Sequence, residues 1–119
     1  MSEKKFSVLS FKYALEGIIA ALKEEPNLKI HFFISVLTLT LSYFLQISRQ
    51  DWINIILVIG FVFAVEFTNT AIEATVDAFT DKQHPGAKLA KDISAGAVLV
   101  AAVTAIVLGL LIFFPYLTK

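Results

Sequence analysis

Residues 52–77 read WINIILVIGFVFAVEFTNTAIEATVD, and the fold class can be predicted from them. It opens with a long apolar run, and Trp52 stands where an aromatic anchor at a membrane interface is expected. About 20 predominantly apolar residues are needed for a helix to cross the hydrocarbon core of a bilayer. We therefore predict a membrane-spanning helix over residues 52–76, although its second half carries ionisable side chains.

Two further apolar segments flank this stretch. Residues 30–47 are softened by serine and threonine and are close to the shortest length that spans a bilayer. Residues 93–114 have only Ser94 and Thr104 as polar side chains. The pattern predicts an all-α integral membrane protein with three transmembrane helices.

The first 25 residues predict an amphipathic helix over about residues 4–24. A signal peptide is not indicated, because polar positions follow the basic start. The helix either lies in the membrane surface or packs on the rest of the protein, and the pattern allows both. Pro26 ends it, since proline disfavours helical geometry in the preceding residue. Its apolar positions at helical spacing are Val8, Phe11, Leu15, Ile18 and Leu22, with Lys12, Glu16 and Lys23 on other faces.

The composition limits what such a chain can be. Its 119 residues are 57% apolar and 17% charged, so three spans leave room for a single domain, residues 1–119, and for no soluble nucleotide-binding fold. The absence of cysteine excludes disulfides and thiol chemistry. A net charge of zero gives no reason to expect nucleic acid as a partner.

The distribution of basic residues predicts the orientation. Of the ten lysines and arginines, five precede residue 32 and three lie between the second and third spans. Only Arg49 and Lys119 lie at the other ends of the spans. The positive-inside rule therefore places the N-terminus and the second loop in the cytoplasm.

The second span carries charges that a bilayer disfavours. At 100° per residue, Glu66, Asn69, Glu73 and Asp77 fall within an arc of about 80° on one helical face. The inner membrane boundary falls near residue 72, which puts Glu66 roughly 9 Å inside it. Ionisable groups at such depth usually face a protein interior or a wet cavity and serve a function. The alternative is that they only pair with lysines or hold helices together.

These carboxylates would suit a divalent cation. Magnesium takes one or two carboxylates and completes its shell with water and substrate phosphates. Glu25, at the cytoplasmic boundary before the first span, could supply a further ligand, although a solvated surface acid is the plainer interpretation.

The start of the third helix supplies counter-charges. Lys88, Lys91 and Asp92 share one face there, and a helix N-terminus favours an anion. The positive-inside rule alone would also put lysines in this loop. His84 could stack on a base or simply end a turn. Soluble phosphate-binding signatures of the GxxxxGK[ST] and GxGxxG types are absent.

Several of these motifs together resemble the prokaryotic diacylglycerol kinase family. The most specific is Glu66-Phe-Thr-Asn-Thr-Ala-Ile-Glu-Ala-Thr-Val-Asp77, and the resemblance covers nearly the whole chain. The other matching parts are residues 10–14, Gly17 and residues 25–31, 80–85, 90–92 and 95–98.

The resemblance implies an ATP-dependent membrane lipid kinase, a homotrimer of three-span protomers with a surface helix and active sites built between protomers. By position, Glu66 would be the general base on the lipid hydroxyl with Asn69 beside it. Glu25 and Glu73 would bind Mg²⁺ at the ATP phosphates. The further positions matching nucleotide contacts are Tyr13, Asp77, Lys82, Gln83, His84, Lys91 and Asp92.

The sequence departs from the family pattern at two positions, and it also carries information about the substrate. Phe6 stands where the family commonly has an arginine, and Pro26 replaces an arginine often found in its Gram-positive branch. His84-Pro85 and residues 27–31 are similar to that branch, which favours undecaprenol over diacylglycerol as the substrate. From other classes, a small ion-conducting oligomer would also explain acids in a span, but it needs neither Lys91 nor a cytoplasmic metal ligand. A purely structural membrane adaptor would leave the acidic face unexplained.

Overall fold

A computed structural model describes residues 3–81 and 83–119, and in these residues the fold is all-helical, as predicted. Three of the helices are long and apolar enough to cross a membrane. The elements in chain order are α1 (Glu3–Glu24), α2 (Pro26–Leu45), α3 (Arg49–Phe79) and α4 (Pro85–Leu117).

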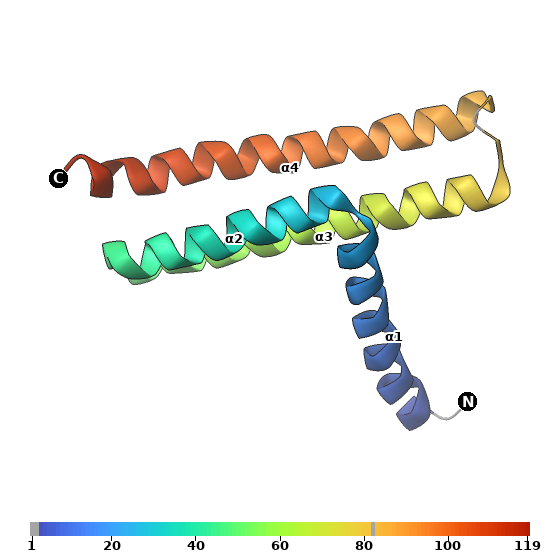
Figure 1. Ribbon diagram of the computed structural model, residues 1–119, viewed down its shortest axis with the longest axis horizontal. Helices are drawn as coiled ribbons and strands as arrows, with labels where there is room; N and C mark the ends of the chain where they lie inside the picture. Colours follow the sequence, from blue (N-terminus) through green and yellow to red (C-terminus); the bar gives the residue numbers. More distant parts are fainter. Residues whose placement is uncertain (1–2, 82) are drawn as a thin grey trace.

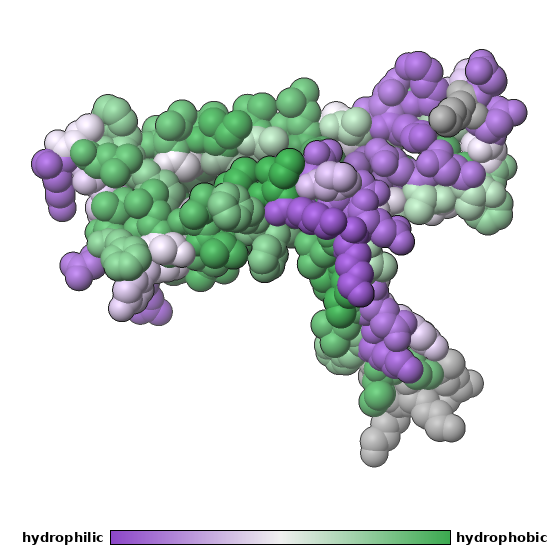
Figure 2. All heavy atoms as spheres, in the orientation of Figure 1, coloured by the Kyte–Doolittle hydropathy of each residue, from purple (hydrophilic) through white to green (hydrophobic). Residues whose placement is uncertain are grey.

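The three long helices form a bundle from which α1 projects (Figure 1). α3 and α4 run antiparallel, and α2 lies beside them. Most of the described apolar side chains of α1, including Phe11 and Leu15, are exposed, and Figure 2 shows a hydrophilic and a hydrophobic side on this helix. The helix therefore does not pack along the bundle, which was one of the two arrangements that the sequence allowed.

α3 and α4 extend beyond the predicted apolar segments, whereas α2 begins at Pro26, before the predicted residue 30, and ends at Leu45 rather than at residue 47. α3 continues to Phe79 and α4 begins at Pro85, so the charged residues near the α3–α4 loop are helical rather than in a long loop. The apolar pattern reports where hydrocarbon ends, whereas helix ends depend on capping. Ser48 caps α3 by accepting a hydrogen bond from the Asp51 backbone N–H at 3.1 Å. Pro26 and Pro85 each stand in a first turn, where no N–H donor is needed.

The side of α2 that faces the bundle follows a spacing of three and four residues. Leu28 and Ser42 are buried on it, and His31, Ser35 and Thr38 are half-buried between them. This spacing keeps one face of a helix against its neighbours along its length. These four polar side chains of α2 thus point inward, while its largest apolar side chains are exposed, as expected for a helix that faces lipid.

The end of the bundle opposite the α3–α4 loop is closed by Tyr116. Its hydroxyl donates to Asp51 Oδ2 at 2.6 Å and accepts from the Ser48 backbone N–H at 2.9 Å. Beneath it, Ile47, Ile55 and Ile112 form a buried apolar cluster. The C-terminal end of α4 is therefore tied to the loop that connects α2 and α3.

We expect Tyr116→Phe to destabilise the protein by about 1 kcal/mol, because it removes one hydroxyl that makes both hydrogen bonds. Thermal unfolding in detergent should then show a midpoint lowered by a few degrees. Tyr43→Phe is the matched control, because the Tyr43 side chain is exposed. Equal midpoints for the two variants would contradict a stabilising role for this contact.

Candidate functional site

The acidic face of α3 begins with a buried carboxylate. Glu66 is 5% exposed, and its Oε1 lies 2.9 Å from Nε2 of His31 on α2. A charged group at this depth is stable only with a partner. The prediction that Glu66 faces a protein interior is confirmed by its burial.

One turn further along α3, Asn69 connects two helices. Its Nδ2 donates to Oε1 of Glu73 at 3.4 Å, and its Oδ1 accepts from the Ser94 hydroxyl of α4 at 2.7 Å. The amide is thereby fixed in orientation between an acid of its own helix and a hydroxyl of α4. Ser94 is itself buried.

The face ends with ion pairs beside the α3–α4 loop. Asp77 Oδ1 lies 2.9 Å from Lys91 Nζ, and Lys88 Nζ lies 2.6 Å from Asp92 Oδ2. A cavity of about 270 Å³ lies between these groups, lined in addition by Val76, Asp81 and Ala87. Asp77, Lys91 and Asp92, which the resemblance linked to the nucleotide, therefore share one cavity.

The remaining nucleotide candidates do not join this cluster. His84 caps α4, because its Nδ1 accepts from the Ala87 backbone N–H at 3.2 Å, which is the plainer of the two roles expected for it. A side chain at position 86 would meet the His84 ring at 3.0 Å, so glycine there leaves room for the cap. Gln83 and Tyr13 are exposed, the latter on the projecting α1. Lys82 and the side chain of Phe6 lie outside the described part.

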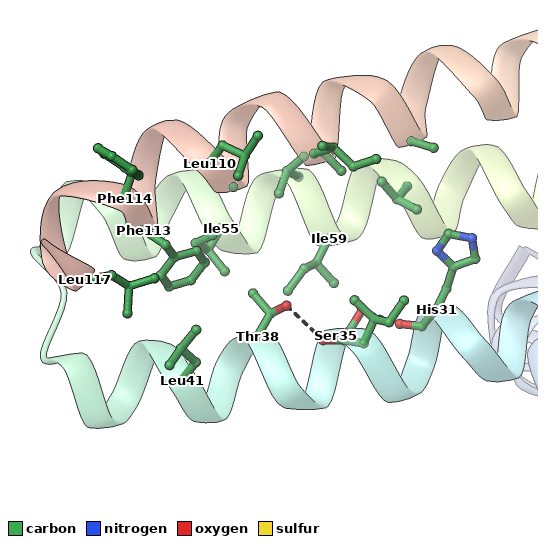
Figure 3. A pocket seen from close by; sticks show the side chains of 17 residues that line it. His31, Ser35, Thr38, Leu41, Ile55, Ile59, Leu110, Phe113, Phe114 and Leu117 are labelled. Carbon is green, nitrogen blue, oxygen red and sulfur yellow. Dashed lines mark hydrogen bonds between the residues drawn. The ribbon is translucent and has the colours of Figure 1, made fainter.

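An apolar cavity adjoins the other end of the acidic face. It measures about 500 Å³, lies between α2, α3 and α4, and has His31 at one end (Figure 3). The imidazole projects from α2 toward α3, and the rest of the lining is almost entirely hydrocarbon. His31 thus belongs both to the apolar cavity and to the Glu66 contact.

The carboxylates expected to hold magnesium lie at different places along the chain. Glu73 is half-buried on α3, and Glu25 is half-buried at the break between α1 and α2. Within the described residues no group of three or more His, Asp or Glu side chains could hold a metal by itself. The donors nevertheless fit Mg²⁺, which needs only one or two protein carboxylates when phosphates and water supply the other ligands.

Sequence reasoning missed the partners of the acidic face, His31 and Ser94. Position 31 was read only as part of a stretch typical of a family branch, and Ser94 only as a polar interruption of an apolar helix. A signal was present on α2, because its polar positions 31, 35, 38 and 42 repeat every three or four residues and so share one side.

Fold and site together define a helical membrane protein in which an acidic helix face, buried at Glu66, joins an apolar cavity to a charged one. Residues 12–113 match the family described as prokaryotic diacylglycerol kinase. The chain is 45% identical over 108 residues to the undecaprenol kinase of Bacillus subtilis (strain 168), which covers 91% of this chain and 88% of that protein.

Two relatives that are named diacylglycerol kinase support the same family assignment. The diacylglycerol kinase of Synechocystis is 35% identical over 91% of this chain and 62% of its own length. That of Pseudomonas aeruginosa is 35% identical over 75% of this chain and 72% of its own. The chain belongs to the prokaryotic diacylglycerol kinase family: it is a multi-pass membrane protein and a lipid kinase that uses ATP. The ion-conducting and adaptor alternatives are thereby set aside.

Proposed function

We propose that the protein transfers the γ-phosphate of ATP to the hydroxyl of undecaprenol. The observation that carries the choice of lipid is the 45% identity, over nearly the full length of both chains, to a protein named undecaprenol kinase. The geometry supports a lipid substrate in general, because the apolar cavity leads to His31 and Glu66 and the charged cavity lies further along the same face.

In this proposal Glu66 is the general base. It accepts the proton of the lipid hydroxyl as the oxygen attacks phosphorus, a contribution of about 100- to 10,000-fold in rate for a well-placed base. Asn69, fixed by Glu73 and Ser94, orients the reacting groups beside it. Phosphoryl transfer depends mainly on such positioning and on stabilising charge.

The charged end of the face would bind the nucleotide. Lys91 is the group that neutralises phosphate charge, and an ATP phosphate competes with Asp77 for it, because the two side chains are paired in the protomer. Glu25 and Glu73 would hold Mg²⁺, which supplies charge neutralisation at the phosphate oxygens when bound. The proposed nucleotide contacts further include Tyr13, Asp77, Lys82, Gln83, His84 and Asp92.

Topology and assembly follow from the same proposal. We place the N-terminus and the α3–α4 loop on the cytoplasmic side of a bacterial inner membrane, supported by eight of ten basic residues lying there. We also propose a homotrimer with sites between protomers. Glu73 is only half-buried and Asp77 is exposed, so the protomer leaves part of the acidic face for a neighbour to cover.

The test measures whether the purified protein transfers phosphate from labelled ATP to each candidate lipid. Detergent-solubilised enzyme is supplied with Mg²⁺ and equal mole fractions of undecaprenol and diacylglycerol. We expect undecaprenyl phosphate as the main product. A main product of phosphatidic acid would instead establish diacylglycerol, the substrate in the names of the two 35% identical relatives, and no labelled lipid at all would overturn the proposal.

A second arm links the substrate to the apolar cavity. Gly109 lines that cavity and a side chain there meets open space, so Gly109→Leu fills part of it. We expect this variant to lose undecaprenol activity. Gly60→Leu is the matched control, because its side chain also meets open space but Gly60 does not line the cavity. Equal activities of the two variants would show that the lipid binds elsewhere.

A further inference from the structure

We propose that His31 is a positioning residue for the phosphotransfer reaction, holding Glu66 in the orientation that meets the lipid hydroxyl. The proposal rests on the general-base role of Glu66 proposed above. It starts from one contact, the 2.9 Å between Nε2 of His31 and Oε1 of Glu66, which joins α2 to the acidic face of α3.

The backbone that carries the imidazole is held by contacts of its own helix. Leu28, three residues earlier on the same side of α2, is completely buried and anchors the first turn against the bundle. Ser35, four residues later, donates its hydroxyl to the His31 carbonyl at 2.8 Å. The ring therefore reaches Glu66 from a rigid segment, which is what a positioning group requires.

The burial of the two partners differs in an informative way. The Glu66 side chain is 6% exposed and that of His31 is 28% exposed. The histidine is thus the partner on the accessible side, and it also lines the apolar cavity. A hydroxyl that arrives from the cavity meets the imidazole and the carboxylate together.

The contact occupies one oxygen of the carboxylate. With Oε1 turned to His31, Oε2 is the oxygen that can accept the substrate proton. A carboxylate with a fixed partner has one orientation, whereas an unpartnered one rotates and loses the attack geometry. The Ser-His-Asp triad uses the same pair of groups with the roles exchanged, since there the acid orients the histidine.

The test compares four variants of the full-length enzyme with the lipid that the wild type prefers. We expect His31→Leu to lower kcat by about 10- to 100-fold, the usual effect of losing a group that orients a reactive ligand. The KM for ATP should stay within about twofold, because ATP occupies the far end of the face. His31→Gln, which carries an N–H donor about as far as Nε2, should recover most of kcat, whereas the shorter His31→Asn should not.

The fourth variant is the control. Thr40→Val makes the same kind of change on an exposed side of α2, outside the cavity, and the Thr40 hydroxyl bonds its own helix. It should keep kcat near the wild-type value. The Gln and Asn variants are similar in polarity, so their comparison remains decisive even where the leucine variant folds poorly.

A double variant shows whether His31 acts through Glu66. In a Glu66→Gln background, His31→Leu should cause no further loss, because the group that it positions is already gone. Full additivity of the two losses would overturn the proposal, as would a raised lipid KM with unchanged kcat. If the wild type is active, Glu66→Gln is inactive and His31→Leu is unaffected, only this inference is refuted. If the wild type itself is inactive, the proposed function is refuted.

Discussion

Replacing Glu66 by glutamine should remove nearly all lipid phosphorylation. We expect kcat to fall by about 100- to 10,000-fold, the contribution of a general base, with KM for ATP little changed. Glutamine is isosteric with glutamate and keeps an oxygen near His31, so the packing between α2 and α3 is preserved. What disappears is the ability to accept the hydroxyl proton at this buried position.

The measurement is the initial rate of lipid phosphorylation in detergent as the concentration of labelled ATP is varied. Circular dichroism and size-exclusion chromatography check that the variant is folded. Glu16→Gln is the matched control, because it removes the same charge from an exposed position on α1. It should behave as wild type. If Glu66→Gln retains more than about a tenth of the wild-type kcat, a base contribution of the expected size is excluded.

The sequence predicted the acidic face of α3 because its cause is local. A helix has a fixed turn, so the positions of Glu66, Asn69, Glu73 and Asp77 on one side follow from their spacing. The high cost of charge in hydrocarbon then indicated that this side faces inward. The burial of Glu66 confirms that step.

What the sequence could not supply is which side chains from other helices meet that face. The contacts from His31, Ser94 and Lys91 depend on how α2 and α4 are rotated about their axes and how far each is shifted along α3. Several rotations bury similar apolar area in a bilayer, where lipid and leucine are equally apolar. Polar side chains such as Ser94 decide between them, and their partners become visible only in three dimensions.

The same limit applies to residues that have two compatible roles. His84 precedes a proline at a helix start, a position that suits a cap, and it also lies in a loop that could reach a nucleotide. Its Nδ1 contact with Ala87 assigns it the cap in the protomer. The nucleotide-facing role proposed for it therefore requires the imidazole to use its other nitrogen or to release the cap.

The two cavities give the arrangement its chemical logic. The first cavity is lined by hydrocarbon, whereas three carboxylates and two lysines line the second. The two cavities therefore suit different substrates, a lipid and a highly charged co-substrate. Glu66, Asn69 and Glu73 lie on the helix between them. Figure 2 shows the corresponding change along the bundle, from an apolar body to a hydrophilic end near the α3–α4 loop. A lipid hydroxyl and a phosphate approaching from opposite ends would meet at this face.

Removing the charge of a proposed metal ligand should change the Mg²⁺ requirement. We expect Glu73→Gln to lower activity at least about 100-fold at ordinary Mg²⁺ and to shift half-maximal activation to higher Mg²⁺, because a metal ligand matters at least as much as the groups that orient it. Glutamine keeps an acceptor oxygen for Asn69 Nδ2, so the loss reports the charge rather than the hydrogen bond. Glu25→Gln should act in the same direction.

Glu24→Gln provides the matched control for this second effect. Glu24 is the exposed neighbour of Glu25 at the end of α1, so the variant removes an equal charge from the same membrane boundary. Its Mg²⁺ titration should overlay that of the wild type. If all three variants shift the titration equally, the cause is the general surface potential, which added salt would screen. If only Glu73→Gln and Glu25→Gln shift it, the two carboxylates bind the ion directly, although Glu73 stands on α3 and Glu25 at the break between α1 and α2.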